Sequence, residues 1–211
     1  MKKFKYYLRD NYKYFSFILS RLHINKSKNK ILFDKIKQYK DLHINKTCYI
    51  LGTGPSLKKV NIRKLENEFV IGTNFVFLHS DFKFLKRTYI CFAPSHQPLN
   101  FDVWYNLFNK INKLNISQLF IGDSKYKYSI GNFLKETNYE KFQNLTLLNY
   151  HYSPILNSKN INFSNFHNLS LGPLISPVTT LVTTLQIAYF MGFKKIRLMG
   201  FDHDILDSYL Q

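Results

Sequence analysis

Residues 47–57 read TCYILGTGPSL, and this stretch decides the fold class. Its first five residues form an apolar run of the length of one buried β-strand, which leads directly into two glycines separated by one residue. Gly52 and Gly54 allow a sharp turn and a close approach of the backbone to a bulky ligand, and Pro55 favours the start of a helix. The stretch therefore predicts a strand, a tight loop and a helical start whose free amides could bind a phosphate.

Two better-known phosphate loops do not match this stretch. Leu57 stands where the third glycine of GxGxxG would be, and the Walker pattern GxxxxGK[ST] is missing. A tight structural turn is the alternative explanation of the two glycines. We treat Gly52, Thr53, Gly54, Pro55 and Ser56 as candidate nucleotide-binding residues.

Further strand-length apolar runs alternate with helical patterns along the rest of the chain. This alternation predicts βαβ units, and so an α/β, Rossmann-like domain with a mainly parallel sheet flanked by helices over residues 47–211. Such sheets bind ligands at the carboxyl ends of their strands. The expected strands are Thr47–Leu51, Phe69–Asn74, Thr88–Ala93, Gln118–Ile121, Leu145–Asn149 and Lys195–Phe201, and the expected helices are Phe101–Leu114, Asn132–Phe142 and Thr180–Met191.

Composition excludes several classes of protein. The chain has 211 residues, of which 45% are hydrophobic and 17% aromatic, so it can bury a core and is neither disordered nor fibrous. Cys48 and Cys91 lie in apolar runs without metal-ligand spacing, which predicts reduced core thiols in a cytoplasmic protein. The formal net charge of +17 attracts polyanions, nucleotides or an anionic membrane surface.

The basic excess is concentrated in an N-terminal extension, residues 1–46. Residues 1–50 hold 13 Lys or Arg and 3 Asp, a net +10 of the total +17. Within residues 1–22 the apolar side chains share one side at helical spacing and cations surround them, which is typical of a helix lying on an anionic bilayer. A helix packed on the domain and a partner-binding helix are the alternatives. Residues 31–39 predict a second short helix.

Polar residues follow the expected strands where a ligand would bind. Asn74 ends the second strand and offers both hydrogen-bond donors and an acceptor, and Ser95 follows the third strand. Thr179 or Thr180 is the expected N-cap of the helix over residues 180–191. The N-terminus of this helix would be a second place where an anion could bind. Local turns and simple capping are the alternatives.

The final expected strand closes with three titratable residues, Asp202, His203 and Asp204. They could hold a cation, orient a sugar hydroxyl or act as acid and base. Three adjacent side chains cannot all face one point, so we expect one or two of them to be structural.

Together these motifs resemble the MptE-like superfamily. The resemblance rests on GTGPSL at 52–57, GTN at 72–74 and the stretch from Thr179 to Asp204, and it covers about residues 47–204. This superfamily includes bacterial lipooligosaccharide sialyltransferases, flagellin glycosyltransferases of the motility-accessory-factor type and archaeal 6-hydroxymethylpterin pyrophosphokinases.

The resemblance implies a Rossmann-like domain that binds a nucleotide-activated donor. By analogy with the sialyltransferases, the GTGPS loop and Asn74 would hold CMP-sialic acid. This chain departs from them at Thr53, where they carry Asn, and at Thr180-Leu181, where they carry Ser-Gly. Their general-base His lies well beyond the Gly-x-Asp strand end, so we expect a C-terminally incomplete member, catalysis by His203 or Asp204, or an inactive protein.

The predicted function is a glycosyltransferase that passes a sugar, plausibly a nonulosonic acid, from a CMP-type donor to a surface glycan or lipid-linked acceptor. It would require no cofactor and no metal, and it would act in the cytoplasm or on the inner face of the membrane. The alternatives are a Mg²⁺-dependent pyrophosphokinase that uses Asp202 and Asp204, and a non-catalytic nucleotide-binding protein. Nucleic acid is disfavoured as a partner because no RNP, KH or helix-turn-helix signature is evident.

Overall fold

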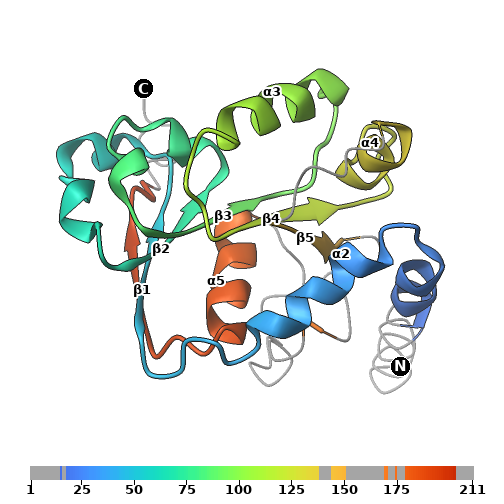
Figure 1. The fold of residues 1–211 in the computed structure, drawn as a ribbon, viewed down its shortest axis with the longest axis horizontal. Helices are drawn as coiled ribbons and strands as arrows, with labels where there is room; N and C mark the ends of the chain where they lie inside the picture. The colour runs from blue at the N-terminus through green and yellow to red at the C-terminus, as the bar shows by residue number, and fades with distance from the viewer. Residues whose placement is uncertain are drawn as a thin grey trace, which may run out of the picture.

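Six parallel strands form one sheet in the computed structural model, which describes residues 15, 18–137, 144–150, 169–170, 174 and 179–202. The order across the sheet is β5-β4-β3-β2-β1-β6, and each strand is parallel to its neighbours (Figure 1). The predicted α/β fold with a parallel sheet is thus confirmed. The strands are β1 Thr47–Leu51, β2 Phe69–Thr73, β3 Arg87–Phe92, β4 Gln118–Asp123, β5 Leu145–Asn149 and β6 Lys195–Met199.

The order of the strands changes direction beside β1. From β1 the chain adds β2, β3, β4 and β5 successively toward one edge, and then returns to place β6 on the other side of β1. Ile50 of β1 is in register with Ile71 of β2 and with Leu198 of β6. In open α/β sheets this kind of reversal leaves a crevice at the carboxyl ends of the strands, where ligands bind.

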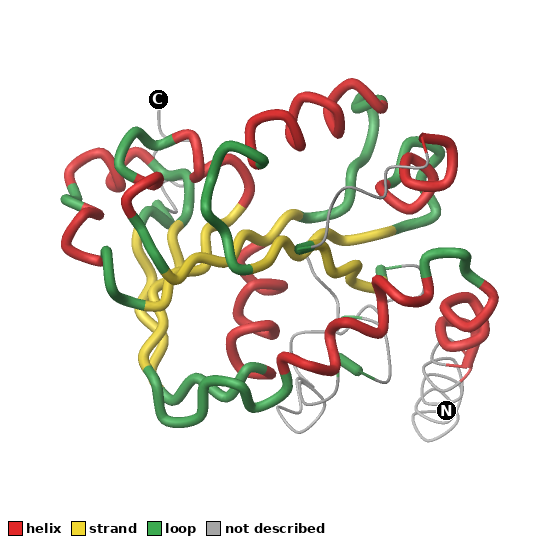
Figure 2. The backbone as a smooth tube through the Cα atoms, in the orientation of Figure 1, coloured by secondary structure: helices red, strands yellow, loops and turns green. Residues whose placement is uncertain are grey.

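Helices cover both faces of the sheet. Figure 1 shows α3 and α4 on one side of the sheet and α5 on the other, and Figure 2 shows the same layers around the strands. The connections after β1 and β2 contain short 3₁₀ segments instead of α-helices. The α-helices are α2 Lys30–Asp34, α3 Phe101–Ile111, α4 Ile130–Thr137 and α5 Thr180–Phe190, and the 3₁₀ segments are η1 Lys35–Tyr39, η2 Pro55–Lys59, η3 Ile62–Leu65, η4 Asn74–Leu78 and η5 Phe82–Phe84.

Alternation along the strands separates two hydrophobic cores. Successive strand residues point to opposite faces, so Ile50 packs in the core on the α5 side while Leu51 packs with α3 and α4. Cys48 and Cys91 belong to the α5-side core, where both are free thiols and buried. The predicted burial of both cysteines is therefore confirmed.

Several expected elements differ from the observed ones. Bounds shift by one to three residues at β3, β4, β6, α3, α5 and the start of α4. The helix predicted over residues 31–39 is split into α2 and the 3₁₀ segment η1. The strand predicted to run to Asn74 ends at Thr73, because Asn74 has a positive φ of 48° that a strand cannot accommodate.

The first part of the N-terminal extension, residues 1–14, 16 and 17, lies outside the described residues, and residues 18–26 are helical. Phe33, Ile36 and Tyr39 are buried against the sheet, so this part of the extension packs on the domain. Within the described part of the chain, no helix is long and apolar enough to cross a membrane.

Candidate functional site

The loop after β1 is bonded to the end of β6 at the reversal of the strand order. The Gly52 N–H donates to the Met199 carbonyl and the Gly54 N–H to the Gly200 carbonyl, each at 2.8 Å. These bonds extend the β1–β6 ladder beyond the strands themselves. They bring the first and the last of the predicted motifs together.

Asp202 closes this contact from the end of β6. One carboxylate oxygen, Oδ2, accepts from the Ser56 N–H at 2.6 Å, within the range of charge-assisted hydrogen bonds. The approach requires glycine at residue 54, because a Cβ there would lie 2.5 Å from Asp202 Oδ2 and 2.7 Å from the Gly200 carbonyl oxygen. Asp202 therefore has a defined role in holding the loop.

These contacts limit how the loop can bind a phosphate. The N–H groups of Gly52, Gly54 and Ser56 donate to acceptors in β6 and its end, and the Leu57 N–H donates to the Gly54 carbonyl. Pro55 has no N–H and begins the 3₁₀ segment η2. The polar groups that the loop can offer a ligand are consequently the exposed Thr53 and the half-buried Ser56 hydroxyl.

Asn74 and Thr180 form a second polar contact at the same edge of the sheet. Asn74 follows β2 in the left-handed conformation, which Asn tolerates better than most residues. The Thr180 hydroxyl donates to Asn74 Oδ1 at 3.1 Å. The contact joins the end of β2 to the first turn of α5.

The first turn of α5 has the character of an anion site. Thr179 is the N-cap, and its hydroxyl accepts from the Val182 N–H at 3.4 Å, as expected of one of the two threonines. Among the described residues the amides of Thr180 and Leu181 have no acceptor, and the helix dipole adds positive potential there. A phosphate would find two amides and the Thr180 hydroxyl at this helix end.

Ser95 has a structural partner within the chain. It is buried, and its hydroxyl donates to the Tyr128 carbonyl at 2.9 Å, which ties the end of β3 to the loop before α4. Strand β2 separates β3 from β1, so Ser95 lies on the far side of Asn74 from the GTGPS loop. Among the described residues, the hydrogen bond of its hydroxyl goes to Tyr128 and not to another predicted site residue.

The two predicted catalytic residues, His203 and Asp204, lie outside the described residues. So do residues 175–178, which precede the N-cap of α5. Within the described ranges, no group of three or more His, Cys, Asp or Glu residues could hold a metal ion.

Phe75 is a feature of this edge that the sequence did not single out. Its side chain is 51% exposed, and its ring lies edge-on to Phe92 at 5.6 Å between centroids. It immediately follows Asn74, and Phe92 is the last residue of β3. An exposed aromatic ring is thus held over the ends of β2 and β3, where a ligand extending from Asn74 could contact it. The run FVFL after Asn74 is typical of buried core, but in the 3₁₀ segment η4 only Val76 and Phe77 are buried, while Phe75 and Leu78 are exposed.

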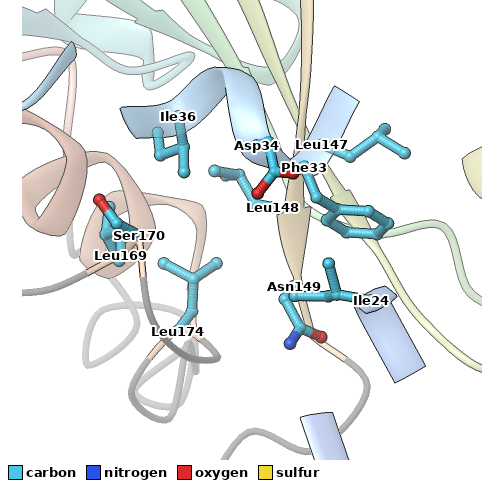
Figure 3. Close-up of a pocket in the computed structure, with 10 residues that line it drawn as sticks. All are labelled: Ile24, Phe33, Asp34, Ile36, Leu147, Leu148, Asn149, Leu169, Ser170 and Leu174. Carbon is cyan, nitrogen blue, oxygen red and sulfur yellow. The ribbon is translucent and has the colours of Figure 1, made fainter. Parts of the chain in front are cut away.

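The cavity drawn in Figure 3 is a different feature. It has a volume of about 40 Å³ and is lined by residues of α2 and β5, including Phe33, Asp34, Leu147 and Asn149. It lies at the β5 edge, whereas the contacts described above lie around β1, β2 and β6. A space of this size holds a water molecule or two, not a nucleotide.

Comparisons with known proteins give distant structural likenesses. No family model matches this chain, and no curated protein matches it in sequence. The sialyltransferase CstII from Campylobacter jejuni, in complex with the substrate analogue CMP-3FNeuAc, aligns with a TM-score of 0.43 and 22% identity. That alignment covers 75% of this chain and 60% of the other, so this chain spans less than two thirds of that protein's length.

Two further solved structures align less closely. CstII in complex with cytidine-5'-monophosphate gives a TM-score of 0.41 and 19% identity over 74% of this chain and 68% of the other. The C-terminal domain of glucosamine-fructose-6-phosphate aminotransferase from Francisella tularensis gives a TM-score of 0.35 and 14% identity over 81% and 42%. All three scores lie below 0.5, so these likenesses are distant.

Proposed function

We propose that this protein is a glycosyltransferase that takes a sugar from a CMP-type nucleotide donor and passes it to a surface glycan or lipid-linked acceptor. The observation that carries the proposal is the contact between Asn74 and Thr180, which joins the end of β2 to the first turn of α5 beside the GTGPS loop. The motif resemblance of the three segments that meet there supports the same function.

The polar groups at this edge suit the parts of such a donor. In the proposal, the donor phosphate lies at the α5 N-terminus, where the Thr180 and Leu181 amides and the Thr180 hydroxyl donate to it. Thr53 and the carboxylate of Asp202 lie beyond the ends of β1 and β6 and would bind nucleoside hydroxyl groups. The Asn74 amide lies between these two places and would orient the phosphate or the sugar.

The proposed reaction is a displacement at the anomeric carbon. The acceptor hydroxyl oxygen forms a bond to that carbon, and the bond to the phosphate oxygen breaks. CMP leaves with the electron pair, and the proton of the acceptor hydroxyl passes to a base, for which His203 and Asp204 are the candidates. The helix dipole and the amides of α5 stabilise the negative charge that grows on the leaving phosphate.

Nucleotide binding provides the first test. The full chain is titrated with CMP, UDP and ATP, each with and without Mg²⁺, and unfolding temperature and heat of binding are measured. We expect metal-independent stabilisation by CMP that Asn74→Ala removes. Asn106→Ala, at an exposed position on α3, is the matched control and should bind like the wild type.

The other outcomes contradict the proposal in distinguishable ways. Binding of ATP only with Mg²⁺ would favour the pyrophosphokinase alternative. Folded protein that binds none of these nucleotides would make the chain a member of this fold without the proposed activity.

A further inference from the structure

A hollow of about 520 Å³ lies between the N-terminal helix, residues 18–26, and the last turn of α4. We call it the basic hollow. It is at the β5 side of the molecule, because Asn29, next to this helix, donates to the Gly131 carbonyl of α4. The candidate nucleotide site lies toward the opposite edge of the sheet, around β1, β2 and β6. The lining residues are Leu19, Leu22, His23, Lys26, Ser27, Lys28 and Lys135.

The charge of the basic hollow has one sign. Lys26, Lys28 and Lys135 line it, and no Asp or Glu does. Over the described part of the chain, none of these three lysines has a carboxylate within ion-pair distance. Farther along the chain, in contrast, Lys30 and Lys37 both pair with Asp34. The lysines of the hollow are therefore available to an external anion.

Exposed apolar side chains accompany the hollow: Leu22 lines it, and the helical residue Phe15 lies about two turns earlier in the sequence. Phe15 and Leu22 are 58% and 48% exposed, and with Leu19 they have the spacing of one helix face. The same helix also has an inner face that packs on the domain, where Ser20 is buried and Ile24 contacts the core. The exposed apolar side chains therefore lie on the outer face of a helix that already has a packing partner. The outer face thus combines apolar side chains with unpaired cations.

We infer that the basic hollow binds the headgroup of an anionic phospholipid while Phe15 and Leu22 enter the bilayer interface. Cations attract the lipid phosphate. Transfer of exposed apolar side chains from water into the apolar part of a bilayer is favourable. A nucleic acid would satisfy the lysines but would leave Leu22 in contact with water, so the observations favour a membrane. The inference goes beyond the nucleotide site and does not depend on it.

Vesicle co-sedimentation of the full chain tests the inference. The probes are vesicles of phosphatidylcholine alone and of phosphatidylcholine mixed with phosphatidylglycerol. We expect binding to the mixed vesicles only, and a loss of at least about thirtyfold in apparent affinity for the double variant Lys26→Glu, Lys28→Glu. Removing two cations near the surface accounts for about thirtyfold, and repulsion of the two new carboxylates adds to it. Lys110→Glu, Lys113→Glu, which makes the same change of charge at exposed positions of α3 and its end, is the matched control and should lose less than about threefold.

A second variant separates insertion from simple charge attraction. Leu22→Ala leaves the charge unchanged and should lower affinity for the mixed vesicles by about fivefold, in proportion to the apolar area removed. Equal losses in the two double variants would mean that net charge alone drives binding and would overturn the inference. Binding to a DNA duplex without binding to the mixed vesicles would overturn it as well. All substituted positions are exposed, and an unchanged unfolding temperature verifies that each variant folds.

Discussion

The backbone N–H of Ser56 donates to the carboxylate of Asp202 at 2.6 Å, although 146 positions separate the two residues in the sequence. This bond fixes the GTGPS loop to the end of the last strand. The shape of the candidate site consequently depends on tertiary contacts between β1 and β6, and not on the loop sequence alone. Because the bond uses the backbone of residue 56, its side chain is not needed for it.

Gly54→Ala should destabilise the protein and disturb the site. The new Cβ would lie 2.5 Å from Asp202 Oδ2 and 2.7 Å from the Gly200 carbonyl, so the end of β6 must move. We expect a loss of about 1–3 kcal/mol in the free energy of unfolding, the usual effect of overpacking. Urea denaturation measures it, with Ser56→Ala as the control that keeps the N–H bond. Equal stability of Gly54→Ala and the wild type would contradict the observed contact.

Asn74 can be tested with two substitutions that separate backbone from side chain. Its φ of 48° suits Gly but not Ala, so Asn74→Gly should be more stable than Asn74→Ala by about 1 kcal/mol. Both variants lose the oxygen that accepts from Thr180, and both should lose CMP binding. Calorimetric titration and thermal unfolding measure the two effects. If Asn74→Gly still bound CMP as tightly as the wild type, the side chain would have no part in the site.

Phe75 should affect the sugar of the donor and not its nucleotide. The ring lies over the ends of β2 and β3, on the side of Asn74 away from the ends of β1 and β6. Removing it in Phe75→Ala should leave the affinity for CMP unchanged and weaken a CMP-linked nonulosonic acid by about tenfold, a usual cost of losing one aromatic contact. Phe75→Tyr keeps the ring and serves as the control. A parallel loss for both ligands would show that the ring contacts the nucleotide instead.

Much of the sheet was predictable because its strands are short apolar runs that end at polar residues or glycines. Five of the six strand starts agree with the sequence prediction, and β3 begins one residue earlier, at Arg87. The 3₁₀ segments were less predictable, since their lengths depend on local turns such as the Asn61 side chain that accepts from the Arg63 N–H. Helix propensity alone does not distinguish such turns from α-helix.

The arrangement of the site was predictable only at the level of strand ends. Parallel topology implies that the residues after β1, β2 and β6 meet at one edge, which makes the polar residues there candidates for the site. The partner of each polar group could not be predicted, because it depends on packing between distant segments. The sequence predicts that Asp202 holds a cation, orients a sugar hydroxyl or acts as an acid or base, but it gives no sign that Asp202 also accepts from the Ser56 amide.

The two cysteines should be unreactive in the folded protein. Burial raises the pKa of both the Cys48 and the Cys91 thiol to about 12, and only the thiolate is nucleophilic. We expect no alkylation of either residue by iodoacetamide near neutral pH, and alkylation of both once urea unfolds the chain. Mass spectrometry after timed labelling measures it. Rapid native labelling of either residue would contradict the packing of the α5-side core.

His43 lies in an aromatic cluster at the end of the sheet opposite the candidate site. Its ring is 4.3 Å from that of Phe69 and 4.8 Å from that of Phe193, measured between centroids. Its Nε2 is joined by a hydrogen bond of 2.8 Å to the Tyr89 hydroxyl. These contacts accommodate a neutral imidazole, whereas a protonated imidazolium at the same place would be poorly solvated.

Stability should therefore fall in mildly acidic solution. Burial lowers the pKa of His43 below its usual 6.5, and the positive charges of Arg87 and Lys46 lower it further. A group whose folded-state pKa is depressed binds its proton more tightly in the unfolded chain. The contribution of neutral His43 to stability is therefore complete above pH 6.5 and is lost as the pH falls from 6.5 toward the lowered value.

His43→Phe keeps an aromatic ring without a titrating group. Urea denaturation across this pH range should therefore show a flatter dependence of stability on pH for the variant than for the wild type. Lys30 and Lys37 hold the pKa of Asp34 below its usual 3.8. Asp34 therefore loses its ion pairs only at lower pH and does not contribute to the difference between the two proteins in this range. Identical profiles for the two proteins would exclude His43 as the source of the acid sensitivity.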